Sequence, residues 1–160
     1  MALEPPDGPE ASYAVLLAAP TGRVFCFYNH NTDNVREVVA NKSSWSPDGV
    51  CRRVDSLGHF CFKFSDDGGR SWSSRRYEIP QRDFEIDREN PYGGRLKFFW
   101  NVGKAFSHQG VAYVPLHKVG GFGHGFFTRS EGVLLVSEDL FTVDDPAQAT
   151  WETLPDGEVG

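Results

Sequence analysis

The sequence contains no apolar run that approaches the roughly 20 residues a helix needs to cross a membrane. It also lacks an excess of positive charge, because the net charge is −6, which predicts no nucleic-acid or anionic-membrane partner. The apolar stretch Ala14–Ala19 follows acidic, proline-rich residues and has no basic region before it. We therefore favour a half-buried strand over a signal peptide there. The compartment stays open, with the cytoplasm as the default.

Cysteine is scarce, and its three positions, Cys26, Cys51 and Cys61, form no CxxC pair and no metal-type spacing. Two of them lie inside aromatic strands, so buried free thiols are favoured. A Cys26–Cys61 bridge stays open if those strands are neighbours. His117 and His124 flank a glycine-rich stretch with no carboxylate between them, which is a weak metal signal. We predict neither a metal nor a cofactor.

Phenylalanine and glycine are plentiful, with 13 and 17 residues, while helical periodicity is rare. This composition predicts short strands joined by many turns, and hence an all-β fold. A chain of 160 residues is long enough to bury a core of its own.

The predicted strands form one unit repeated twice. The first half has strands at 13–19, 23–30, 60–65 and 76–79, and the second at 96–106, 111–116, 132–136 and 150–155. Four strands per repeat is the composition of a propeller blade. We therefore divide the chain into a disordered segment (1–12), a first blade (13–80), an inter-blade loop (81–95) and a second blade (96–160).

The turn between the last two strands of the first half has the spacing Ser-x-Asp-x-Gly-x-Ser-Trp, which is that of an Asp box. Its members are Ser65, Asp67, Gly69, Ser71 and Trp72. An aspartate can accept hydrogen bonds from turn N–H groups, a glycine can adopt positive φ, and a tryptophan can fix the turn to a sheet. The motif therefore indicates architecture rather than chemistry.

The second half carries a degenerate copy of this motif. Ser137 and Asp139 match the first Ser-x-Asp, and Trp151 matches the first tryptophan across a turn stretched by residues 142–149. Chance occurrence of such a string is the alternative.

With these features the chain resembles the amino-terminal part of a sialidase-superfamily protein with Asp-box (BNR) repeats, of the exo-alpha-sialidase-like kind. The resemblance runs from about residue 13 to 160, and its most telling stretches are 27–34, 53–60, the Asp box and 98–104. It implies a six-bladed propeller. Because two blades cannot close a ring, we expect the chain to be part of a longer protein or to self-associate over its open edges.

Sialidases hydrolyse terminal sialic acids with a Tyr nucleophile assisted by a Glu, an Asp acid/base and three carboxylate-binding arginines, as the resemblance implies. Residues 1–11 contain no arginine, so the first of those arginines is missing. The Tyr, its Glu and the later arginines would belong to blades beyond residue 160. We therefore expect this chain alone to be inactive.

The remaining candidates lie on long loops, which alternating strand direction places on the face opposite the Asp box. Asp33 and Asp55 are the candidates for the acid/base, and for each a turn or capping role is the alternative. The candidates for substrate binding are Arg36, Arg53, His59 and His124.

The expected function is a sialidase-like glycoside hydrolase that acts on a terminal sialic acid or a related acidic glycan. A non-catalytic glycan-binding or scaffold propeller is one alternative, and a related propeller polysaccharide lyase is another.

Overall fold

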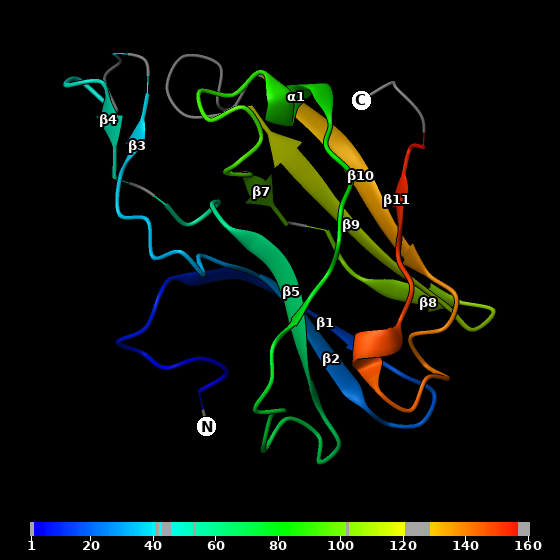
Figure 1. Ribbon diagram of the computed structural model, residues 1–160. Coiled ribbons are helices and arrows are strands. Elements are labelled where there is room, and N and C mark those ends of the chain that lie inside the picture. The colour runs from blue at the N-terminus through cyan, green and yellow to red at the C-terminus, as the bar shows by residue number, and fades with distance from the viewer. Residues whose placement is uncertain are drawn as a thin grey trace.

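The computed structural model describes residues 2–40, 42, 46–52, 54–101, 103–120 and 129–156. They form an all-β fold of two large antiparallel sheets and one short hairpin (Figure 1). Neither large sheet closes on itself in the part of the chain described. In the same residues, no helix is long and apolar enough to span a membrane.

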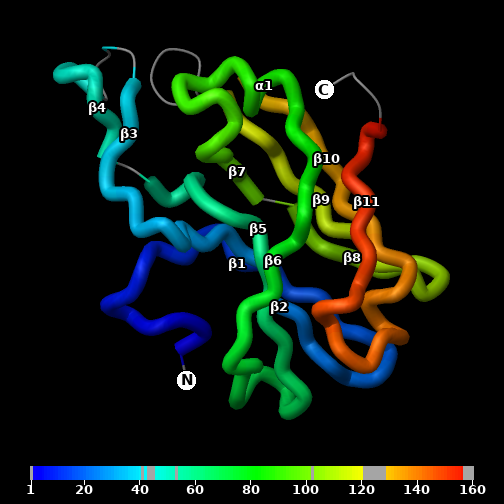
Figure 2. The backbone as a smooth tube through the Cα atoms, in the orientation of Figure 1, coloured from blue at the N-terminus to red at the C-terminus, as the bar shows by residue number. Residues whose placement is uncertain are grey.

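The first sheet is a meander in the order β1-β2-β5-β6. Its strands are β1 (Ala11–Ala18), β2 (Val24–His30), β5 (His59–Ser65) and β6 (Tyr77–Glu78), which Figure 2 shows running side by side. Alternation along β5 sends Phe60 and Phe62 to one face and Cys61 to the other, as expected for a strand with both faces covered. The sequence predicted these four strands to within about two residues at most ends.

The second sheet has the order β11-β10-β9-β7, and β8 also pairs with β9. Its strands are β7 (Phe99–Trp100), β8 (Phe106–His108), β9 (Val111–Val119), β10 (Ser130–Ser137) and β11 (Glu152–Leu154). Because β7 pairs with the end of β9 and β8 with its start, the two act as one interrupted strand. The second sheet is therefore also a four-step meander.

The connections hold the remaining elements, which are β3 (Val38–Val39), β4 (Val50–Cys51), α1 (Glu85–Arg88) and the 3-10 helix η1 (Pro146–Gln148). The one-turn α1 lies within the segment predicted as an inter-blade loop. Asp87 closes its first turn by accepting a hydrogen bond from Phe84 N at 2.9 Å. A single turn is too short to produce the periodicity by which helices are recognised in a sequence.

The main core lies between the two sheets. Phe27 and Phe62 on the first sheet face Val114 and Leu135 on the second, and all four are buried. Trp151, next to β11, reaches across to both phenylalanines with ring centroids 6.0 and 6.3 Å away. Aromatic contacts of this kind add to the area buried and fix how the sheets stack.

The amino-terminal residues differ from the disordered segment expected at 1–12. Strand β1 begins at Ala11, and Leu3 packs on the outer face of the first sheet with Tyr28. The cysteines are as predicted: Cys26, Cys51 and Cys61 are all free and buried.

Candidate functional site

The long connections gather at one end of the molecule. The hairpin β3–β4 and helix α1 lie at that end, while the Asp-box turn and the turn between β1 and β2 lie at the other (Figure 1). This separation follows from strand alternation, because the loop after β2 and the loop after β6 must leave the sheet on the same side.

A pocket of about 330 Å³ lies where the long connections meet the start of β5. Its apolar wall is formed by side chains from both sheets, including Phe60 and Phe99. Its polar side chains come from four separate segments and are Asp33, His59, Glu78, Gln81, Arg95 and Lys97. The pocket therefore exists only when both sheets are assembled.

The imidazole of His59 lies between two carboxylates. Its Nε2 is 3.8 Å from Asp33 Oδ2, and its Nδ1 is 3.6 Å from Glu78 Oε2. The His59 side chain is 44% exposed, so a ligand in the pocket can reach it. Both distances are longer than a hydrogen bond, so the three side chains form an open charged cluster at the pocket.

The loop that carries Asp33 is held by the buried side chain of Asn31. Its Nδ2 donates to Val35 O at 2.7 Å, and its Oδ1 accepts from Val35 N at 3.0 Å. These two bonds close the loop on either side of Asp33, and Asn34 completes it with a positive φ of 51°. An asparagine is well suited to such a turn because its side chain imitates the backbone.

Gly58 fixes the position of His59. Its φ is +124°, and its N donates to Lys97 O at 3.1 Å. A Cβ atom there would overlap the carbonyl oxygen of His30 on the neighbouring strand. This close approach requires glycine and brings the strand start against the segment that carries Lys97.

Two basic residues line the same pocket. Lys97 Nζ lies 2.5 Å from Asp83 Oδ1, and this ammonium lowers the pKa of Asp83 below its ordinary value. Arg95 donates through Nε to Tyr92 O at 3.2 Å and is exposed. The pocket therefore combines acidic and basic groups, an arrangement that can bind a ligand bearing both hydroxyls and a carboxylate.

Asp55, the other acid/base candidate, does not line this pocket. Its Oδ2 accepts a hydrogen bond from the Tyr13 hydroxyl at 3.0 Å. Tyr13 itself has a positive φ of 60°, at the irregularity between Ser12 and Val15 in β1. Among the two candidates, only Asp33 shares the pocket with His59.

The four residues predicted to bind the substrate do not all lie at the pocket. His59 lines the pocket, whereas Arg36 is exposed and lies outside its lining. Arg53 and His124 lie outside the described residues. The sequence did not single out Glu78, Arg95 or Lys97, because their proximity to His59 depends on strand register and on contact between the sheets.

The Asp box lies at the opposite end and forms the local network that its spacing predicts. Asp67 accepts from Ser71 N at 2.9 Å and from Ser71 Oγ at 2.5 Å, while Ser65 Oγ accepts from Gly69 N at 2.8 Å. The hydrogen bonds from Ser71 hold the pKa of Asp67 well below its ordinary value. Trp72 packs on the outer face of the first sheet.

The turn after β10 repeats this network. Asp139 accepts from Thr150 N and from Thr150 Oγ1, both at 2.8 Å, and Ser137 Oγ donates to Asp139 Oδ1 at 3.0 Å. Thr150 thus takes the place of Ser71, after a longer connection that contains η1. The two turns share one hydrogen-bond pattern despite their different lengths.

In the part of the chain described, no group of three or more His, Cys, Asp or Glu side chains is arranged to hold a metal ion. No protein-family model, curated protein or solved structure matches the chain.

Proposed function

We propose that the pocket around His59 binds an acidic sugar, and that the chain is of the sialidase-like glycoside hydrolase class with Asp33 as its acid/base. The observation that carries the proposal is the placement of His59 between Asp33 and Glu78, next to Arg95 and Lys97, in one pocket. A volume of about 330 Å³ is within the range of small-ligand sites.

Each group has a chemical role in this proposal. Arg95 and Lys97 would hold the sugar carboxylate through charge-assisted hydrogen bonds. Asp33 in its protonated form would donate its proton to the glycosidic oxygen as the bond from that oxygen to the anomeric carbon breaks. The tyrosine nucleophile that the resemblance implies would form the new bond to the anomeric carbon. His59, whose side chain is 44% exposed, would contact the bound sugar beside Asp33.

The second candidate function is sugar binding without cleavage. No tyrosine lines the pocket among the described residues, whereas the sialidase reaction implied by the resemblance uses a tyrosine nucleophile. We therefore expect this chain on its own to bind an acidic sugar and not to hydrolyse a sialoside.

Binding can be tested by titrating the chain with N-acetylneuraminic acid and, as the control lacking a carboxylate, N-acetylmannosamine, with NMR or calorimetric detection. We expect the acid alone to bind, with a Kd on the order of 1 mM for a single sugar. Lys97→Met should weaken binding by at least about tenfold, since a charge-assisted hydrogen bond contributes roughly 1.5–3 kcal/mol. Arg36→Ala, outside the pocket, is the matched control and should bind as the wild type does.

Equal binding of both sugars, or binding unaffected by Lys97→Met, would rule out the acidic-sugar site. Turnover is measured separately with a fluorogenic sialoside. Release of the fluorophore that Asp33→Ala abolishes would exclude the binding-only candidate and assign the hydrolase to this chain.

A further inference from the structure

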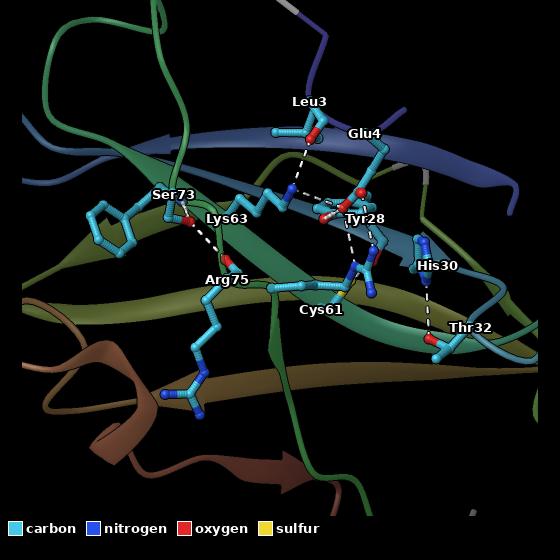
Figure 3. Close-up of polar contacts among 11 residues, drawn as sticks. Leu3, Glu4, Tyr28, His30, Thr32, Cys61, Lys63, Ser73 and Arg75 are labelled. Carbon is cyan, nitrogen blue, oxygen red and sulfur yellow. Dashed lines mark hydrogen bonds and ion pairs between the residues drawn. The ribbon is translucent and has the colours of Figure 1, made fainter. Parts of the chain in front are cut away.

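The outer face of the first sheet holds a second polar site, remote from the core between the sheets. Leu3 and Glu4, near the start of the chain, lie over Tyr28, Cys61 and Lys63 on this face (Figure 3). The Glu4 side chain is only 8% exposed, although it belongs to a segment without strand or helix. A buried carboxylate on such a segment requires specific partners.

Three side chains hold the Glu4 carboxylate. Arg76 forms a two-pronged contact, with Nε 3.1 Å from Oε1 and Nη2 3.0 Å from Oε2. Lys63 Nζ is 3.3 Å from Oε1, and the Tyr28 hydroxyl donates to the same oxygen. Burial opposes ionisation, but the bonds from Arg76 and Tyr28 prevail and lower the pKa of Glu4 to about 2. Two cations surround one carboxylate, so the site favours anions.

The site also contacts the residue that precedes the glutamate. Lys63 Nζ donates to Leu3 O at 2.9 Å, and the Leu3 side chain packs on the cluster of Cys26, Tyr28 and Cys61. The sheet therefore recognises a backbone carbonyl, an apolar side chain and a carboxylate on consecutive residues. This combination is specific to a peptide, since a free acid has only the last of the three.

The rest of the segment fits the sheet loosely. A cavity of about 480 Å³ lies between residues 3–14 and Tyr28. The segment forms a turn of its own, Gly8 N to Pro5 O at 3.0 Å, and joins the sheet again where Asn31 N donates to Glu10 O at 2.9 Å. The segment is thus held at Leu3–Glu4 and again at Glu10, and the contacts of Leu3 and Glu4 can be exchanged without breaking a strand.

We propose that this face of the first sheet is a docking site for a peptide segment of another protein in which an apolar residue directly precedes a glutamate or aspartate. Leu3–Glu4 is its intramolecular occupant. The chain that links Leu3–Glu4 to β1 holds this occupant at an effective concentration on the order of millimolar. An external peptide therefore binds well only when the contacts of the occupant are weakened or the occupant is displaced. The proposal is independent of the sugar site.

The test uses the full chain carrying Leu3→Ser with Glu4→Gln, and a fluorescein-labelled peptide with the wild-type sequence of residues 2–10 as the probe. Fluorescence anisotropy should show at least tenfold tighter peptide binding to this double variant than to the wild type. The same peptide with glutamine at the position of Glu4 should bind at least tenfold more weakly. Arg76→Met, added to the double variant, should abolish binding.

His59→Ala is the matched control, because His59 lies four residues before Lys63 on the same strand, about 13 Å away. Its addition to the double variant should leave peptide binding unchanged and should affect only the sugar site. Circular dichroism checks the fold. If the double variant does not fold, Glu4→Gln alone is used with the same criteria.

Three results would overturn the proposal. The first is a folded variant that does not bind the peptide, and the second is equal binding of the glutamine peptide. The third is displacement of the labelled peptide by N-acetylglutamate as effectively as by the unlabelled peptide.

Discussion

A buried ion pair anchors the segment that carries α1 to the second sheet. The side chains of Lys118, on β9, and Asp87, on α1, are both 0% exposed and form a direct ion pair. Lys118 Nζ also donates to Arg82 O at 3.1 Å and lies 4.8 and 5.4 Å from the ring centres of Phe84 and Phe99. Burial lowers the pKa of Lys118, an effect that the Asp87 carboxylate opposes. The charged form of each side chain is therefore stabilised by the other.

We predict that Lys118→Met lowers the free energy of unfolding by roughly 3–5 kcal/mol, because it leaves the Asp87 carboxylate buried without its cation. Asp87→Asn should have a similar effect on Lys118, while its amide oxygen can still accept the hydrogen bond from Phe84 N. The double variant removes both charges, so we expect it to lose only about 1–3 kcal/mol. Losses of this size are large against a total stability of roughly 5–15 kcal/mol.

Urea unfolding followed by tryptophan fluorescence measures these differences. With a slope of about 2 kcal/mol/M, a loss of 4 kcal/mol moves the midpoint by about 2 M. Arg52→Met serves as the control, because its partners Asp48 and Glu37 are exposed and the midpoint should stay unchanged. A shift below about 0.5 M for Lys118→Met, or a double variant equal to the sum of the single ones, would refute the argument.

Three further outcomes concern stability. The pKa of Glu4 is about 2 in the folded chain, below its ordinary 4.5, so its stabilising effect is complete above pH 4.5 and is lost as the pH falls towards 2. Wild type should lose about 2 kcal/mol more than Glu4→Gln over that range, as unfolding midpoints at each pH will show. Gly58→Ala should lower the free energy of unfolding by at least about 2 kcal/mol, because its Cβ meets the His30 carbonyl. An unchanged thermal midpoint would contradict this. Phe62→Ala should lower the free energy of unfolding by about 3–5 kcal/mol, because Phe62 is buried. Phe106→Ala, on the surface, should lower it by under about 1 kcal/mol, and urea unfolding compares the two.

The strands and turns were largely predictable because their signals are local. In β5, three phenylalanines alternate with other residues, and this period of two is that of a strand. The Asp box closes within seven residues, from Ser65 to Ser71, through hydrogen bonds of its own side chains. The Ser-x-Asp start of its second copy was also recognisable, but that network closes only at Thr150, 11 residues beyond Asp139, which the sequence did not single out.

The pocket could be predicted only in part. Its end of the molecule follows from strand alternation, and Asp33 and His59 were candidates from their loops. The rest of its lining was not predictable, because Glu78 reaches His59 through the pairing of β6 with β5, and Lys97 through contact between the sheets. Such contacts join residues far apart in the chain, and which of them meet depends on how the two sheets stack rather than on a local pattern.

The sequence by itself therefore determined the all-β class, the two sets of four strands and the first turn network, since each depends on residues within one strand or one turn. Only the tertiary structure decided which charges meet. It joined Glu4 to Arg76, Lys118 to Asp87, and His59 to two carboxylates. A charged side chain attracts any opposite charge, so its partner is selected by the packing of the sheets rather than by its neighbours in sequence.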